Sequence, residues 1–212
     1  MTLESWLPHV LLPGCPQILA LDAIRSAARE FCQNTLAWQY TQDPVTVYVG
    51  EGEYAYEPPS SNAEVVQPVY GFFNGVSIPV KSQQEVAEHY PGVNWLTQTG
   101  TPRFVVHLTP RHANLVPIPD TRVINALTLR VALKPTLGAT EIDDAVFEEH
   151  RDAIAWGAKS RLKMMSEQPF FNTDGARIDR QLFVAAMADE RIRVWRGHGP
   201  AVLTARPRRK FA

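Results

Sequence analysis

The stretch 13–39, PGCPQILALDAIRSAAREFCQNTLAWQ, decides the first element of the fold. Apolar side chains recur in it at helical spacing, and polar side chains fill the positions between them. This pattern predicts an amphipathic helix from Pro16 to Trp38, which must pack one face on other elements. Pro16 suits the first turn, where its missing N–H costs no hydrogen bond. The residues of the packed face, called the scaffold residues below, are Leu21, Ile24, Ala28, Phe31, Cys32 and Trp38.

From residue 43 to residue 135 the pattern changes to short runs rich in β-branched and aromatic residues, bounded by Gly and Pro. Asn74 and Gly75 form a dipeptide that is typical of a two-residue hairpin turn. Ser82 and Glu85 have the spacing of a capping box and predict one short helix within the region.

Alternation is clearest from Val123 to Leu133, where it places Ile124 and Ala126 on one face of a strand. The strands do not alternate with helices long enough for parallel crossovers. We therefore expect a compact antiparallel β region rather than a doubly wound sheet.

Two further helices are predicted after the β region. The first begins near Glu141 and carries acidic residues in its first turns and basic residues in its last, which complements the helix dipole. Its apolar residues are Phe147, Ile154, Ala158, Leu162 and Met165. The second runs from about Ile178 to Trp195, and its apolar side is formed by Ile178, Leu182, Ala185 and Ile192.

These elements predict an α+β fold, in which the opening helix and the two C-terminal helices form a bundle that carries the β-rich region as an insertion. The expected domains are a helical bundle of residues 1–42 and 138–198 and an inserted β-rich domain of residues 43–137. Residues 199–212 are expected to form an extended basic C-terminal arm.

Composition excludes several protein classes. The chain has 212 residues with a formal net charge of −1, so the molecule as a whole is not an electrostatic nucleic-acid binder. The first residues do not read as a signal peptide, and no apolar run approaches the length of a membrane span. We expect synthesis in the cytoplasm. Two cysteines provide neither a disulfide framework nor a zinc site.

No catalytic, cofactor-binding or metal-binding motif is found. Glu148 to Asp152, EEHRD, is not a metalloprotease motif, and a solvated helix face is the favoured interpretation. His107 and His112 have a spacing that could bind a metal, but no cysteine or carboxylate cluster lies beside them. Glu141, with the two aspartates that follow it, is explained as an acidic first helical turn. A nucleophile of a spatial triad cannot be identified from sequence alone.

The basic C-terminal end is more informative. No acidic residue follows Glu190, whereas seven basic residues do: Arg191, Arg193, Arg196, Arg206, Arg208, Arg209 and Lys210. Three interpretations stand beside one another for this arm: a solubilising tail, a contact with nucleic-acid phosphates, or a segment that becomes ordered on a partner protein. The arm residues are Arg206, Pro207, Arg208, Arg209, Lys210 and Phe211.

Taken together, these features resemble the tailed-bacteriophage head-to-tail adaptor (connector) proteins. In that family a PGCP sequence precedes a helix with the pattern Ala-x-Arg-x-Ala-Ala-x-x-Phe-Cys and a later Trp. The matching residues here are 13–16, Ala23, Arg25, Ala27, Ala28, Phe31, Cys32 and Trp38. The β-rich insertion, the stretch FEEHRDAIAWGAKSRLKMM and the terminal RPRRKF also resemble the family. The resemblance spans most of the chain and is least specific within 43–135.

The resemblance implies a virion structural protein at the neck of the particle, not an enzyme. Such adaptors form a homo-oligomeric ring, commonly of twelve subunits, beneath the portal protein. They extend the channel through which genomic DNA passes without sequence-specific binding, and they dock a tail tube or nozzle protein. The C-terminal arm reaches along the portal. Acidic candidates for the channel lining are Glu51, Glu53, Asp143 and Asp144.

A ring requires two different, complementary faces on each subunit. The alternative within the same class is a tail completion, stopper or tail terminator protein one ring further from the head. A small enzyme or a DNA-binding module is a third hypothesis.

Overall fold

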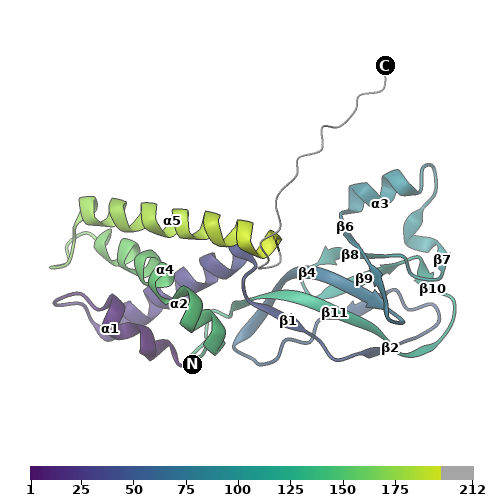
Figure 1. Cartoon of the computed structure of the whole chain (residues 1–212), viewed down its shortest axis with the longest axis horizontal. Coiled ribbons are helices and arrows are strands. Elements are labelled where there is room, and N and C mark those ends of the chain that lie inside the picture. Colours follow the sequence, from purple (N-terminus) through teal and green to yellow (C-terminus); the bar gives the residue numbers. More distant parts are fainter. Residues whose placement is uncertain (197–212) are drawn as a thin grey trace, which may run out of the picture.

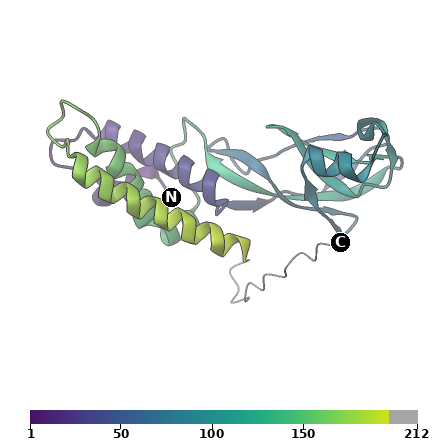
Figure 2. The same cartoon turned by 90° about the horizontal axis from the view of Figure 1, so that it is seen from above.

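The computed structural model describes residues 1–196, and it has an α+β fold. Two lobes lie end to end, one made of helices and one made mainly of strands (Figures 1 and 2). The expected arm 199–212, including Arg206 to Phe211, lies outside the described residues.

The helical lobe contains both ends of the described chain. Its elements are a 3₁₀ turn η1 (Leu3–Trp6) and the helices α1 (Leu7–Val10), α2 (Gln17–Thr35), α4 (Asp144–Lys163) and α5 (Thr173–Trp195). The first ten residues, for which the sequence predicted no element, are anchored by Trp6, whose ring meets Phe147 edge-on at a centroid distance of 4.6 Å. In the three-helix arrangement α4 packs against both α2 and α5, so the bundle predicted from sequence is present.

The β lobe holds three sheets and a short helix α3 (Gln83–His89). The five-stranded sheet consists of β1 (Gln39–Thr41), β2 (Val45–Val47), β4 (Ala63–Phe73), β5 (Val76–Ile78) and β11 (Val123–Pro135), in the order β1-β11-β4-β5 with β2 also on β11. The four-stranded sheet is β3 (Glu53–Ala55), β9 (His112–Val116), β8 (Phe104–Thr109) and β6 (Val80–Lys81). A third sheet pairs β7 (Thr99–Gly100) with β10 (Ile118–Pro119).

Two local predictions in this lobe are confirmed. Asn74 and Gly75 have φ angles of 50° and 76° and join β4 to β5 in the hairpin that pairs Phe73 with Val76. The Ser82 hydroxyl accepts a hydrogen bond from the Glu85 N–H, and the Glu85 carboxylate accepts one from the Ser82 N–H, so α3 begins with a complete capping box.

The antiparallel β-rich region predicted from sequence is present, and two of its strand pairs are parallel. β6 pairs with β8, and β7 with β10, in parallel. The chain between the members of each pair is long enough to reverse direction twice. The expected alternation in β11 also breaks, because Asn125 has a positive φ of 49° and the register shifts between Val123 and Leu127. Ile124 is therefore exposed while Ala126 is buried.

The two larger sheets pack face to face where β4 crosses β8. A Cβ atom at Gly71 would lie 2.6 Å from Val105 Cγ2, so the absence of a side chain at Gly71 allows this approach. Apolar side chains of both sheets and of all three long helices belong to one continuous core. A smaller cluster beneath α3 contains Val86, Trp95, Phe104, Val106 and Val116.

Helix α2 ends at Thr35 and not at Trp38, because Leu36 adopts a left-handed conformation with φ 59°. Gln39–Thr41, assigned from sequence to the helical domain, instead forms β1 on the edge of the five-stranded sheet. A link of three residues, 36–38, therefore joins the two lobes on this side. The carbonyl of Trp38 accepts a hydrogen bond of 2.7 Å from the Leu133 N–H of β11.

Polar contacts reinforce the junction between α2 and β11. Arg29 donates to the carbonyl of Pro135 and to Glu64 Oε2, the latter at 3.1 Å. Lys134 Nζ lies 3.2 Å from Glu64 Oε1. Burial would raise the pKa of Glu64, but hydrogen bonds and charges from Arg29 and Lys134 outweigh burial and hold the pKa below its usual value. The carboxylate thus bridges a helix and a strand.

Helices α4 and α5 begin at polar caps. Asp143 accepts a hydrogen bond of 2.9 Å from the Ala145 N–H at the start of α4, and Asn172 accepts one of 2.8 Å from the Gly175 N–H at the start of α5. The starts predicted from sequence, Glu141 and Ile178, were three residues too early and five residues too late.

We predict that Phe31→Ala lowers the free energy of unfolding by about 3–5 kcal/mol, because the ring is fully buried where α2 faces α4 and α5. Ile18→Ala, at a position of the same helix that is 76% exposed, is the control and should cost less than about 0.5 kcal/mol. Urea unfolding followed by circular dichroism measures both. A loss below about 1 kcal/mol for Phe31→Ala would contradict its place in the core.

We predict that Gly157→Ala also destabilises the protein, by about 1–3 kcal/mol. Alanine normally stabilises a helix interior relative to glycine by about 0.5–1 kcal/mol. In α4, however, the new Cβ would lie 2.9 Å from Phe183 Cε2 and 3.0 Å from Ala27 Cβ. Gly138→Ala, where a Cβ meets open space, is the control. A melting temperature of Gly157→Ala at or above that of the wild type would contradict the claim that close packing at Gly157 excludes a Cβ atom.

Candidate functional site

The scaffold residues are placed largely as the sequence predicts. Ile24, Ala28, Phe31 and Cys32 are fully buried. Leu21 is half-buried at the edge of the core, and Trp38 is buried in the link after the helix. These residues hold the lobes together and leave no reactive group accessible.

Neither thiol is disposed to react. Burial raises the pKa of the Cys32 thiol to about 12. Burial also raises the pKa of Cys15, against a smaller opposing effect of its hydrogen bond with the Leu12 backbone. Nucleophilic cysteines require a thiolate, so the structure gives no support to covalent chemistry at either residue.

The packed face predicted for the last helix is wrong. Ile178, Leu182 and Ile192 are 57%, 41% and 47% exposed, and Ala185 is exposed too. The buried side of α5 instead contains Ala176, Asp179, Phe183 and Glu190. Phe183 is the one large apolar side chain of α5 that is fully buried, and Ala186 and Met187 pack partly buried against the same core. The more regular apolar stripe therefore faces solvent.

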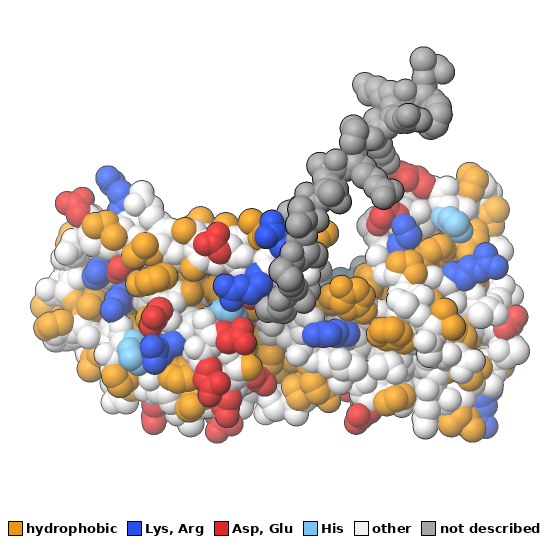
Figure 3. Space-filling view, in the orientation of Figure 1, with side chains coloured by type: hydrophobic (Ala, Val, Ile, Leu, Met, Phe, Trp, Pro, Cys, Tyr) orange, Lys and Arg blue, Asp and Glu red, His pale blue; other side chains and the backbone are white. Residues whose placement is uncertain are grey.

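The outward face of α5 forms an apolar surface on the helical lobe. Val184 and Trp195 add to it with exposures of 46% and 79%. Hydrophobic side chains are visible along the upper edge of this lobe, where α5 runs (Figure 3). Contiguous exposed apolar surface on a folded protein is typical of an interaction site.

The β lobe has its own exposed apolar side chains. Tyr70 and Phe72 alternate with buried residues along β4 and project from the outer face of the five-stranded sheet. Tyr70 lies across from Arg130, and Phe72 lies across from Thr128, on β11. Beside α3, Val93 and Leu96 are also about half exposed. The two lobes thus carry separate apolar surfaces.

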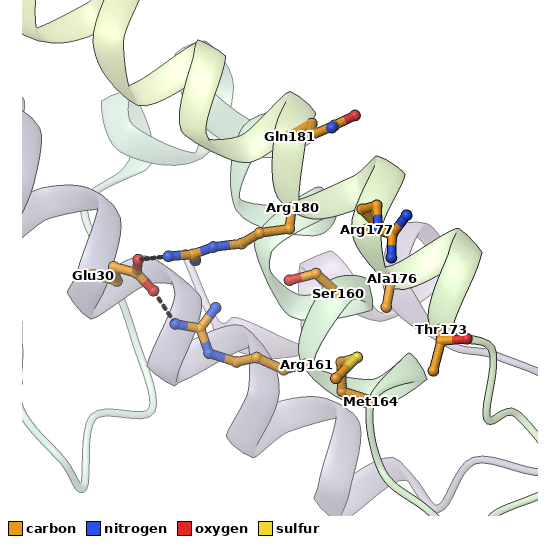
Figure 4. A pocket seen from close by; sticks show the side chains of 9 residues that line it. All are labelled: Glu30, Ser160, Arg161, Met164, Thr173, Ala176, Arg177, Arg180 and Gln181. Carbon is orange, nitrogen blue, oxygen red and sulfur yellow. Dashed lines mark hydrogen bonds and ion pairs between the residues drawn. The ribbon is translucent and has the colours of Figure 1, made fainter.

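A groove of about 810 Å³ lies between α4 and α5. At its α2 side, Glu30 accepts a hydrogen bond of 2.7 Å from Arg180 and another from Arg161 (Figure 4). Burial would raise the pKa of Glu30, but the two arginines outweigh it and hold the pKa below its usual value. Arg177 also lines the groove, and Met164 and Ala176 supply apolar surface. The arrangement ties three helices together.

A second polar cluster lies on the other side of the α4–α5 contact. Glu190 is buried, with Oε2 3.1 Å from an Arg193 nitrogen and Oε1 3.8 Å from His150 Nε2. The ring of His150 packs against Phe31 at a centroid distance of 4.8 Å. Within the stretch EEHRD, the histidine therefore turns inward to the core, and Glu148 and Asp152 face solvent. The stretch therefore forms part of α4 with one buried side chain, His150, and a solvent-exposed face.

The two histidines that could have bound a metal have other contacts. His107 Nδ1 is hydrogen-bonded to the Tyr56 hydroxyl at 2.8 Å, and burial lowers the pKa of His107 while raising that of Tyr56. His112 Nδ1 lies 3.4 Å from the Thr109 hydroxyl. Within residues 1–196 there is no group of three or more His, Cys, Asp or Glu residues suited to hold a metal ion.

The four acidic candidates for a channel lining are not brought together. Asp143 and Asp144 lie at the start of α4, where Asp144 contacts the Met1 amine. Glu51 and Glu53 lie in the β lobe, and Glu53 Oε1 accepts a hydrogen bond of 3.3 Å from Asn114. Within the described chain these carboxylates therefore lie in two separate places, one in each lobe.

The comparisons with known proteins add no family: no family model and no curated protein sequence matches this chain. Among the helices of residues 1–196, none has both the length and the apolar character that crossing a membrane requires. The function is therefore inferred below from the exposed apolar and charged side chains of the molecule.

We predict that Glu30→Gln lowers the free energy of unfolding at pH 7 by about 0.5–1 kcal/mol, because the carboxylate is partly solvated. A carboxyl group whose pKa is lowered by folding stabilises the protein above its unfolded pKa and ceases to do so as pH falls through its folded pKa. The difference in the free energy of unfolding between wild type and Glu30→Gln should therefore become smaller below about pH 4.

Urea unfolding over a pH series measures this difference. Glu57→Gln is the control, since Glu57 is exposed and makes no side-chain hydrogen bond or ion pair within the described part of the chain. An unchanging difference between pH 7 and pH 3 would contradict the role given to the Glu30 carboxylate.

Proposed function

We propose that this protein is a head-to-tail adaptor of a tailed bacteriophage. In this role it forms a homo-oligomeric ring, of twelve subunits in the family it resembles, beneath the portal protein in the neck of the virion. The ring extends the DNA channel and docks a tail tube or nozzle protein. Its work is structural and not enzymatic.

The observation that carries the proposal is the presence of separate exposed apolar surfaces on the two lobes. One follows the outward face of α5, and the other includes Tyr70 and Phe72 on the outer face of the five-stranded sheet. A subunit in the middle of an assembly needs different surfaces for different neighbours. Apolar side chains that remain exposed on the free chain supply them.

The arrangement of charge also supports an assembly role. The basic segment 206–210 follows α5 in the sequence, and the outward face of α5 forms the apolar surface of the helical lobe. A short basic segment without enough apolar residues for its own core becomes ordered by binding a partner. We assign portal attachment to this segment, which lies outside the described residues.

Deleting residues 206–212 should abolish attachment to the portal and leave the melting temperature unchanged. The test mixes the purified portal oligomer of the same phage with the full-length or shortened protein, followed by size-exclusion chromatography and electron-microscopic class averages. The full-length protein should add a ring to the portal.

A matched variant with Ala at Arg206, Arg208, Arg209 and Lys210 keeps the length of the arm and removes its charge. Loss of attachment in this variant would assign the interaction to charge rather than to length. Attachment of the shortened protein at the wild-type level would overturn the assignment of the arm. Failure of the full-length protein to bind the portal would overturn the proposed function.

A further inference from the structure

The exposed side of α5 repeats at the spacing of a helix that packs along another helix. Its positions alternate between three and four residues apart, which is the 3.5-residue repeat of a coiled-coil seam. The residues at these positions, called the α5 seam, are Ile178, Gln181, Ala185, Ala188, Ile192 and Trp195. All six are exposed, and Phe183 and Glu190 lie on the opposite, buried side of the helix.

The dimensions of the seam suit a helical partner. From Ile178 to Trp195 the helix rises by roughly 26 Å. The centre of the seam is formed by two alanines, Ala185 and Ala188, where small side chains let a second helix approach closely. Larger side chains stand at its ends. Leu182 and Val184 extend the apolar surface on its two sides.

Charge along the edges of the seam selects the partner. Arg177 and Arg191 flank it on one side, and Arg196 and Asp189 flank it on the other. Within residues 1–196, none of these three arginines makes a side-chain hydrogen bond or an ion pair. Charged residues at such flanking positions set the choice of partner in paired helices, and an arginine edge favours carboxylates opposite.

We propose that the α5 seam binds an α-helix of a partner protein that has apolar residues at seam positions and Asp or Glu at flanking positions. This inference rests on the proposed function in treating α5 as a docking surface, and it adds the chemistry of the partner. The partner helix lies along α5 and covers Trp195, while its carboxylates meet Arg177 and Arg191.

Two other occupants fit less well. If two copies of α5 paired through the seam in parallel, Arg191 of one copy would approach Arg196 of the other, which is unfavourable. An antiparallel pair would place Arg191 beside Val184 of the other copy and leave it without a carboxylate. Duplex DNA would meet the arginines with its phosphates but would leave Ile178 and Ile192 against a charged backbone. The experiment below tests for binding of each of these two occupants.

The test uses the full-length protein and a labelled helical peptide of four heptads, with Leu at seam positions and Glu at flanking positions. A matched peptide carries Lys in place of Glu. Fluorescence anisotropy should show that the Glu peptide binds at least tenfold more tightly than the Lys peptide. The protein variant Arg177→Glu/Arg191→Glu should reverse that preference.

Seam variants separate the α5 surface from the basic residues 206–210, which every variant retains. Ile178→Glu/Ile192→Glu should weaken binding of the Glu peptide at least tenfold with unchanged circular dichroism, because both positions are exposed. Ile18→Glu, on an exposed position of α2, should bind as the wild type does.

Equal binding of the two peptides, or full binding by the seam variant, would overturn the inference. So would sedimentation evidence for dimers that the seam variant abolishes, or displacement of the Glu peptide by a short DNA duplex. A protein that attaches to the portal and ignores the Glu peptide keeps the proposed function and loses only this inference. One that binds the peptide but not the portal loses the adaptor assignment and keeps the α5 surface.

Discussion

The structure depends on the burial of one face of α2. Along this helix Ile24, Ala28 and Phe31 face the core. The helix packs against α4 and α5 on one side and against β11 on another. Burying a large apolar side chain contributes roughly 1.5–3 kcal/mol, which is substantial beside the total stability of a domain. Because the same helix contacts both lobes, the lobes share one continuous core and are not independent domains joined by a linker.

The polar contacts follow from that arrangement. Glu30 and Glu64 each join α2 to other elements through two basic side chains, and Gly157 lets α4 approach α2 and Phe183 closely. The inner side of α5 packs into the core through Phe183, with Ala186 and Met187 beside it, whereas the apolar stripe on its outer side is exposed in the single chain. This division of one helix into a folding side and an exposed side is the physical basis of the docking proposals.

Sequence reasoning predicted the fold class, the hairpin at Asn74 and the capping box at Ser82, because each depends on local periodicity or turn chemistry. It failed where tertiary contacts decide. The apolar stripe of α5 was assigned to the core, although its regular repeat at Ile178 and Ile192 would equally have predicted an outer seam. The cluster at Glu30 and the buried contact of His150 with Glu190 could not be predicted, because their members come from different helices. The positive φ of Asn125, which breaks the alternation in β11, could not be predicted from the residues around it.

The link of three residues between α2 and β1 has a mechanical consequence. Leu36 adopts a left-handed conformation and the Trp38 carbonyl is hydrogen-bonded to β11. Residues 36–38 are therefore too short and too constrained to act as a hinge. The second crossing, from β11 to α4, is held by Arg29 on Pro135 and by Arg25 on the carbonyl of Ala139, the latter at 2.9 Å. A force that tilts the helical lobe therefore tilts the long strands with it, and the molecule transmits displacement from one end to the other as a lever.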